Sequence, residues 1–160
     1  MADVGCGAGY FALKLAGAVG AFGSVQAVDV LRLPLAFLWI RRARGGRHNI
    51  HLIPGEPDDP HISGRLDAAL LADTYHELSR PEIILRYLHS ALVLGGRLVV
   101  ADRGTDSASA EHAIDPSVVE AELRRNGFEN ISRNNHFLDQ PAEGPWWLIT
   151  VRRPYNEAKV

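Results

Sequence analysis

Short apolar runs alternate with longer amphipathic segments along the chain, and this alternation predicts strands separated by helices. The predicted strands are Met1–Val4, Ser24–Val30, Asn49–Ile53, Leu66–Ala72, Arg97–Asp102, Phe128–Phe137 and Trp146–Arg153. The predicted helices are Tyr10–Val19, Pro34–Arg44, Pro81–Leu94 and a last one that begins at Asp115-Pro116 and ends at Gly127. Strands and helices in turn predict a doubly wound, mostly parallel α/β sheet with right-handed crossovers.

The same pattern predicts where some strands lie in the sheet. Leu66–Ala72 is almost continuously apolar, which is typical of a central parallel strand covered on both faces. The loop before the last strand contains Pro141, Gly144 and Pro145, so we expect the last two strands to form an antiparallel pair. The polar loops 54–64 and 103–114 carry no clear periodicity.

Apolar residues at helical spacing predict which helix faces are buried. In the first helix these residues are Phe11, Leu15, Ala18 and Val19. In the helix that begins at Pro81 they are Ile84, Leu88, Ala91 and Leu92. In the last strand Trp146 and Trp147 are neighbours, so only one of them can face the core.

The segment Asp3–Gly9, D-V-G-C-G-A-G, has a glycine at every second position between the first strand and the first helix. Only glycine readily adopts a positive φ and lets a ligand touch bare backbone, and the helix N-terminus favours an anionic group. Asp29 ends the next strand, where an acid commonly hydrogen-bonds a ribose diol. The spacing predicts a nucleoside site at Gly5, Gly7, Gly9 and Asp29; the alternative is a tight turn without a ligand.

The dinucleotide fingerprint G-x-G-x-x-G is absent from this loop. Counted from Gly5, its third glycine would stand at Tyr10. Counted from Gly7, it would stand at Ala12. Both mismatches weigh against NAD and FAD as ligands.

Composition sets limits on size and partners. The 160 residues, 46% hydrophobic and 22% charged, predict a single domain, 1–160, with one well-buried core. The formal net charge of −2 makes a nucleic-acid partner an unfavoured expectation. The local exception is a basic cluster, which we interpret as a solvated helix end rather than an RNA or phosphate site. Its members are Arg41, Arg42, Arg44 and Arg47.

The single cysteine, Cys6, cannot form an intrachain disulfide and suits a reducing, cytoplasmic compartment. The histidines are scattered without ligand spacing, so we expect no metal. The apolar stretch Leu31–Ile40 is interrupted by Arg32 and Pro34 and is too short to cross a bilayer, so we expect no membrane partner.

Five segments in order resemble the class I S-adenosylmethionine-dependent methyltransferases. Asp3–Gly9 resembles their motif I, and Asp29 resembles the acid of motif II. The other three are G-E-P-D-D-P at 55–60, D-T-Y-H-E at 73–77, and L-V-L-G-G at 92–96, where Leu94 replaces the usual proline. Asn126-Gly127-Phe128 resembles the common A-G-F. The chain is most similar to small bacterial methyltransferases of unassigned substrate.

The resemblance implies a Rossmann-like fold of seven strands, S-adenosyl-L-methionine as cofactor and a role for each matching residue. Gly5 and Gly7 approach the amino-acid end of the cofactor, Asp3 binds its ammonium through water, and Asp29 binds the ribose. Val30 packs on the adenine, and either Glu56 or Asp58 accepts from its amino group. Asp73 and Tyr75 line the methyl end. His76 is the candidate general base, or it only orients the loop or the acceptor.

Family members usually carry helices before the first strand, so the resemblance implies an N-terminally truncated chain. We expect a partner or a second copy to cover the face that those helices would cover. The leading hypothesis is methyl transfer to a small molecule. A non-catalytic cofactor-binding domain is the alternative, and an NAD-binding oxidoreductase is a weaker one.

Overall fold

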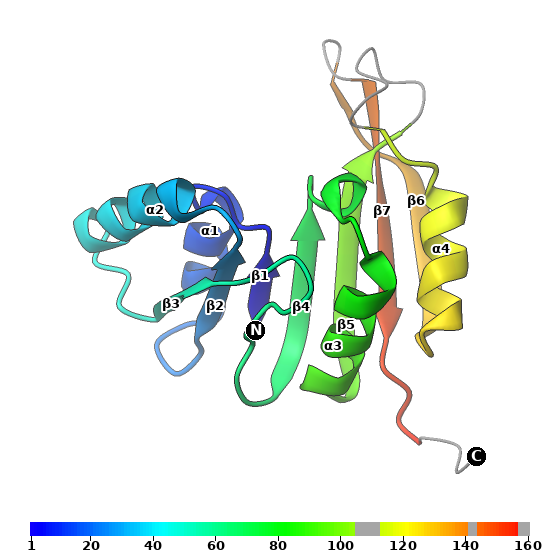
Figure 1. The fold of residues 1–160 in the computed structure, drawn as a ribbon, viewed down its shortest axis with the longest axis horizontal. Coiled ribbons are helices and arrows are strands. Elements are labelled where there is room, and N and C mark those ends of the chain that lie inside the picture. Colours follow the sequence, from blue (N-terminus) through cyan, green and yellow to red (C-terminus); the bar gives the residue numbers. More distant parts are fainter. Residues whose placement is uncertain (105–112, 141–143, 157–160) are drawn as a thin grey trace.

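The computed structural model describes residues 1–104, 113–140 and 144–156, and these form one seven-stranded sheet in the order β3-β2-β1-β4-β5-β7-β6 (Figure 1). Its strands are β1 Ala2–Val4, β2 Val25–Asp29, β3 Ile50–Pro54, β4 Leu66–Ala72, β5 Leu92–Arg103, β6 Glu129–Gln140 and β7 Gly144–Arg152. The first five strands are parallel to one another, whereas β7 is antiparallel to both β5 and β6. The predicted parallel sheet with a C-terminal antiparallel pair is therefore confirmed.

The helices cover both faces of this sheet. They are α1 Tyr10–Ala18, α2 Arg32–Arg44, α3 Pro81–Ala91 and α4 Pro116–Arg125, with a short 3-10 turn, η1, at Tyr75–Glu77. Ala27 packs in the core under α1 and α2, while its neighbour Val28 packs in the core under α3 and α4. Because consecutive strand residues point to opposite faces, the two helix pairs lie on opposite sides of the sheet.

Two predicted helix ends differ from the observed ones. α2 begins at Arg32 rather than Pro34, because a proline in the first turn removes no intrahelical hydrogen bond. α3 ends at Ala91 rather than Leu94, because Leu92 adopts an extended conformation and pairs with Leu66. Pairing in the sheet therefore overrides the helical periodicity at this position.

The predicted buried face of α1 is only partly confirmed, since Leu15 and Val19 are partly buried and pack against the core. The buried residues are Ala12 and Ala16, whereas Phe11 is 38% exposed. Small side chains let the helix approach the sheet closely, and a search for large apolar residues overlooks them. In α3 the prediction is largely confirmed, since Ile84 and Leu88 are buried.

Trp147 anchors the antiparallel end of the sheet. It is buried and its indole N–H donates to the backbone carbonyls of Arg103 (3.1 Å) and Ile114 (3.0 Å). Trp146 is only half-buried, as the alternation predicts. Most of the predicted loop 103–114 lies outside the described residues. Among the described helices, none is long and apolar enough to cross a membrane.

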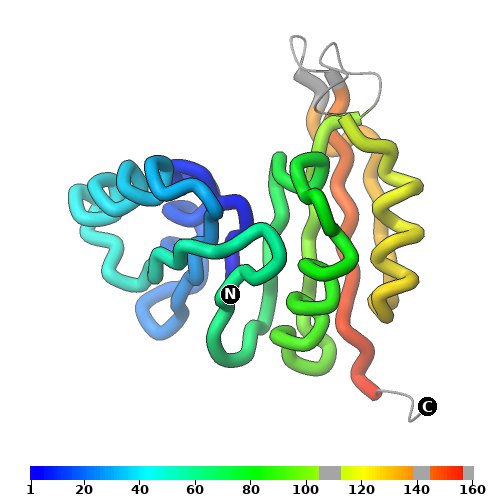
Figure 2. Tube along the Cα trace, viewed as in Figure 1, coloured from blue at the N-terminus to red at the C-terminus, as the bar shows by residue number. Residues whose placement is uncertain are grey.

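The strand order reverses between β1 and β4: β2 and β3 follow on one side of β1, and β4 and β5 on the other. In Figure 2 the blue-to-cyan part of the chain lies on one side of these strands and the green-to-red part on the other. Ligands of open α/β sheets bind at such a point, beyond the carboxyl ends of the strands. The fold therefore brings together the segments that follow β1, β2, β4 and β5.

Candidate functional site

The loop between β1 and α1 depends on its three glycines. Gly5, Gly7 and Gly9 have φ values of 74°, 51° and 82°, in the left-handed region that favours glycine. A Cβ on Gly9 would lie 2.2 Å from a methyl carbon of Leu38, whereas a Cβ on Gly7 would meet nothing within 4 Å. Gly9 is thus required by packing, and Gly7 leaves its backbone open toward the pocket.

Asp29 fixes this loop from the neighbouring strand. Its Oδ2 accepts a hydrogen bond from the backbone N–H of Gly7 (2.7 Å), and its Oδ1 accepts one from that of Leu31 (2.8 Å). The carboxylate is 9% exposed and lines the pocket. An ionised carboxylate accepts about four hydrogen bonds, so Asp29 keeps capacity for a ligand after holding the loop.

A cavity of about 410 Å³ opens beside this loop, a size typical of small-molecule sites. Six residues expected at the site line it: Gly5, Gly7, Asp29, Val30, Glu56 and Asp73. Five others do not line it: Asp3, Gly9, Asp58, Tyr75 and His76. Glu77, which the sequence analysis did not assign to the site, is among the lining residues.

The structure separates the two candidate adenine acceptors. Glu56 lines the pocket, whereas Asp58 forms an ion pair with Arg80 of the segment before α3. Of the two, only Glu56 therefore lines the cavity.

Tyr75 does not line the cavity, contrary to the expectation from the resemblance. Its ring is buried in the core, and its hydroxyl donates to a carboxylate oxygen of Glu122 in α4 (2.6 Å). Burial and this carboxylate raise the pKa of Tyr75. The side chain fastens η1 to α4 and is directed away from the cavity.

Asp3 lies under the glycine loop and is 2% exposed. Burial raises the pKa of this carboxyl to about 7, with a hydrogen bond from the Ala12 backbone opposing the rise and the charge of Asp29 adding to it. Its Oδ2 has no hydrogen-bond partner among the described residues. A buried acceptor of this kind suits a nearby cation or a water that contacts one.

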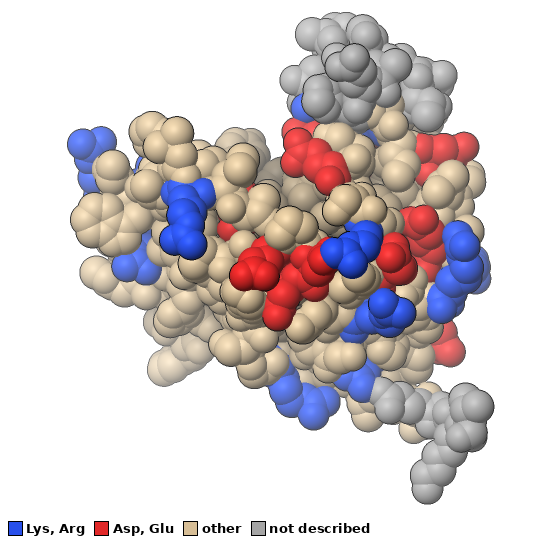
Figure 3. Space-filling model, in the orientation of Figure 1, with Lys and Arg blue, Asp and Glu red and all other residues tan. Residues whose placement is uncertain are grey.

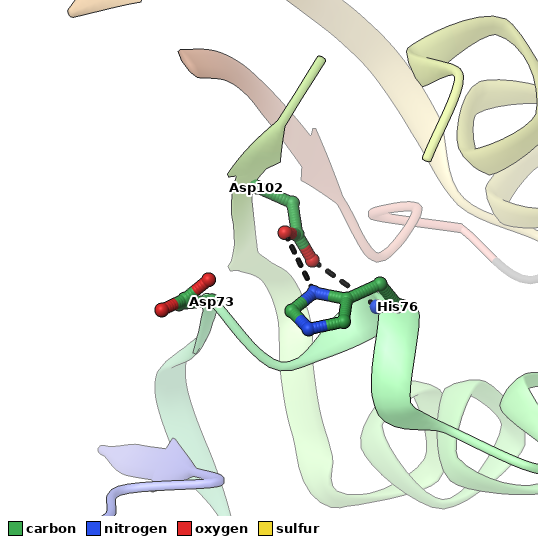
Figure 4. Close-up of side chains that lie close together, drawn as sticks. All are labelled: Asp73, His76 and Asp102. Atoms are coloured by element: carbon green, nitrogen blue, oxygen red, sulfur yellow. Dashed lines mark hydrogen bonds and ion pairs between the residues drawn. The ribbon is translucent and has the colours of Figure 1, made fainter. Parts of the chain in front are cut away.

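His76 follows β4 in the 3-10 turn and is held by an acid from the next strand (Figure 4). Its ring Nδ1 lies 2.8 Å from Oδ1 of Asp102, and its backbone N–H donates to Oδ2 at 3.1 Å. Asp102 is fully buried and ends the predicted strand Arg97–Asp102. The sequence analysis did not assign Asp102 to the site, although Asp102 shares with Asp29 the position of an acid at the carboxyl end of a strand.

Asp73 lines the cavity and lies close to His76 and Asp102. It has a positive φ of 54° and its carboxylate accepts a hydrogen bond from Arg103 (2.8 Å). Asp73, His76 and Asp102 each offer one ligand-type atom within 4.8 Å of the others, a grouping that sequence spacing did not predict. The Arg103 guanidinium already neutralises part of this charge and the Asp102 carboxylate already engages Nδ1, so the donor set fits proton transfer better than a cation.

The charged residues that line the cavity are all acidic in the part of the chain that the structure describes. Asp29, Glu56, Asp73 and Glu77 line it, and no Lys or Arg is among its described lining residues. Figure 3 shows acidic side chains across the middle of this face, with basic ones between them and on both sides. A cationic ligand is therefore favoured over an anionic one.

Comparison with known proteins agrees with this geometry. A family model described as "Methyltransferase domain" matches residues 2–100. The search of curated proteins found no match. Among solved structures, a SAM-dependent methyltransferase from Aquifex aeolicus is similar at 23% identity and a TM-score of 0.80, over 94% of this chain and 80% of that one.

Two further structures share the fold. A SAM-dependent methyltransferase from Thermotoga maritima, described as a possible histamine N-methyltransferase, has 17% identity and a TM-score of 0.75 over 95% of this chain and 80% of that one. A phosphoethanolamine N-methyltransferase from Haemonchus contortus, in complex with S-adenosylhomocysteine, has 15% identity and a TM-score of 0.78 over 96% of this chain and 48% of that one. At these identities the likeness establishes the fold.

Proposed function

This chain belongs to the methyltransferase-domain family, and on that premise we propose that it transfers the methyl group of S-adenosylmethionine to a small-molecule acceptor. Methyl transfer with this donor follows from the family. The acceptor class and the roles of individual residues are our proposal.

The observation that carries the proposal is the open backbone at Gly7 beside the Asp29 carboxylate. Together they offer a cradle without side-chain atoms and an acceptor with capacity to spare. We assign the ribose hydroxyls to Asp29, the adenine face to Val30 and the adenine amino group to Glu56. Gly5 and Gly9 shape the loop, and Asp3 acts on the ammonium of the cofactor through water.

The chemistry requires little covalent help from the protein. S-adenosylmethionine, when bound, supplies an already activated methyl group. The residues of the chain hold the donor and acceptor in line, and positioning of this kind supplies roughly 7–11 kcal/mol of barrier reduction. We assign the methyl end of the cofactor to Asp73, and the removal of a proton from the acceptor to His76.

The hydrogen bonds made by the basic cluster agree with a small acceptor rather than a nucleic acid. Arg41 donates to the carbonyl of Ala8 (2.5 Å), and Arg42 donates to that of Ile50 (2.5 Å). These arginines brace the glycine loop and β3, which accounts for two of the four basic side chains without a nucleic acid.

The lone thiol of Cys6 is buried, and we place the enzyme in the cytoplasm.

Two measurements test the proposed function. Calorimetric titration with S-adenosylmethionine, S-adenosylhomocysteine and NAD is expected to show binding of the first two and not of NAD. Release of S-adenosylhomocysteine is then assayed against a panel of small metabolites. Binding of NAD alone would favour an oxidoreductase, and cofactor binding without turnover of any metabolite would favour a non-catalytic binding domain.

A further inference from the structure

Asp102 is a fully buried carboxylate that the roles assigned above leave unused. It accepts hydrogen bonds from the backbone N–H groups of His76 (3.1 Å) and Arg103 (2.8 Å). Its third partner is the imidazole Nδ1 of His76 at 2.8 Å. Burying a carboxylate is costly unless donors surround it, and here two of the three donors belong to one residue, His76.

This contact decides which ring nitrogen of His76 carries the lone pair. An ionised carboxylate only accepts hydrogen bonds, so Nδ1 is the donor. A neutral imidazole has one ring hydrogen, which leaves the lone pair on Nε2. Figure 4 shows one ring nitrogen directed to Asp102 and the other turned away from it.

A second acceptor lies close to Nε2. Oε1 of Glu77 is 3.9 Å from it; Glu77 lines the cavity, whereas His76 does not, so the cavity comes close to Nε2 at Glu77. One nitrogen can donate to both acceptors at ordinary hydrogen-bond distances of about 2.9 Å. An ammonium group has enough hydrogens to do so, whereas a hydroxyl has only one.

The charge around the cavity favours the same class of acceptor. Four acidic residues and no Lys or Arg are among its described lining residues, and one of these acids, Asp73, is paired with Arg103. An acceptor that carries a carboxylate or phosphate would be repelled there, because juxtaposed like charges are unfavourable. A protonated amine would be attracted.

On the basis of the proposed function, we propose that the acceptor is a small primary amine that Glu77 holds and His76 deprotonates, with Asp102 as the positioning residue for His76. The ammonium gives one proton to Nε2, and its nitrogen lone pair forms the bond to the methyl carbon. The carbon–sulfur bond breaks and its electron pair stays on sulfur. The product leaves as a methylammonium, and His76 returns its proton to water.

The tautomer of His76 is tested first, because it needs neither acceptor nor variant. Nitrogen-15 NMR of the wild-type protein, with labelled histidine and at a pH where imidazoles are neutral, is expected to show the Nδ1-protonated ring for His76. The His76→Gln variant assigns the signal. An Nε2-protonated ring would overturn the proposal.

Kinetics of variants separate positioning from simple structure. Asp102→Asn is expected to lower kcat by about 100-fold or more, since an amide can reverse the tautomer, and to leave the S-adenosylhomocysteine Kd within about twofold. The double variant with His76→Gln should be no slower than His76→Gln alone. A purely structural Asp102 would instead make the two losses multiply, and this would overturn the assignment.

The acceptor class is tested with primary amines of graded size, each paired with the alcohol of the same carbon skeleton. Methylation is expected for amines and not for the alcohols, without dependence on added Mg²⁺, Mn²⁺ or Zn²⁺. Glu77→Gln should raise the KM for amines roughly tenfold or more, whereas the exposed Glu82→Gln should not. Turnover of alcohols alone, or only with a metal, would overturn the inference but leave methyl transfer intact; failure of the cofactor to bind would overturn the proposed function itself.

Discussion

At the scale of single residues, Asp29 has two tasks that are separable in the structure. Two backbone N–H groups already occupy part of its carboxylate, and the rest faces the cavity. Asp29→Ala is expected to weaken S-adenosylhomocysteine binding by about 1–3 kcal/mol, the usual range for hydrogen bonds to a charged group. Calorimetry is the measurement, with the exposed Asp67→Ala as control. Unchanged affinity would remove Asp29 from the site.

Tyr75 gives a prediction of the opposite kind, because it lies in the core rather than the cavity. Tyr75→Phe removes the hydroxyl that donates to Glu122 (2.6 Å) and leaves a partly buried carboxylate without this donor. We expect the free energy of unfolding to fall by about 1–3 kcal/mol, measured by urea denaturation, while cofactor affinity stays the same. Weaker cofactor binding at unchanged stability would return Tyr75 to the site.

At the scale of elements, the turn between β1 and α1 combines a packing glycine and a binding glycine. Gly9→Ala puts a methyl group into the Leu38 side chain, whereas Gly7→Ala puts one into open space. Both strain a positive φ by roughly 1–2 kcal/mol. We therefore expect Gly9→Ala to lose more stability by thermal denaturation, and Gly7→Ala to lose more cofactor affinity by calorimetry. Equal effects of the two on both quantities would contradict this division.

The buried carboxyl group of Asp3, in β1, makes the stability of the protein depend on pH. The folded pKa of Asp3, about 7, lies above its ordinary value of 3.8, so between these values the folded state binds more protons than the unfolded state. The contribution of Asp3 to the free energy of unfolding is fully present below pH 4 and is lost as the pH rises toward 7. Between pH 4 and pH 8 the wild type should lose roughly 4 kcal/mol relative to Asp3→Asn. Urea unfolding at both pH values measures the difference, and a pH-independent difference would contradict it.

The strands were predictable from sequence because each is a short apolar run bounded by turn residues. The ends of the helices were less predictable. α3 ends early because Leu92 is extended and pairs with Leu66, which lies in a strand distant in the chain. The fully buried residues of α1, Ala12 and Ala16, were missed because alanine carries little hydrophobic signal. At the site, Asp29 was found from its position at a strand end. The link between His76 and Asp102 was not found, because it joins the short turn η1 after β4 to a residue of β5, and only the order of the strands in the sheet brings these together.

At the scale of the whole molecule, the site belongs to the sheet rather than to one segment. Its lining comes from the ends of β1, β2 and β4 and the loop after β3, and Asp102 adds the end of β5. The first core packs under α1 and α2, and the second under α3 and α4. A ligand at the switch point therefore contacts segments rooted in both cores, and its binding is expected to stabilise the fold as a unit.

The gain in the free energy of unfolding depends on the ligand concentration relative to its Kd. S-adenosylhomocysteine at 100 times its Kd should add about 2.7 kcal/mol to the free energy of unfolding, whereas NAD at the same concentration should add nothing. If Asp29→Ala weakens binding about tenfold, the gain at the same concentration falls to about 1.4 kcal/mol. Urea unfolding with and without each ligand, followed by both tryptophan fluorescence and circular dichroism, measures these gains. Coincident transitions by the two probes would show that both cores respond together, and a shift seen by only one probe would mean that the ligand stabilises only part of the sheet.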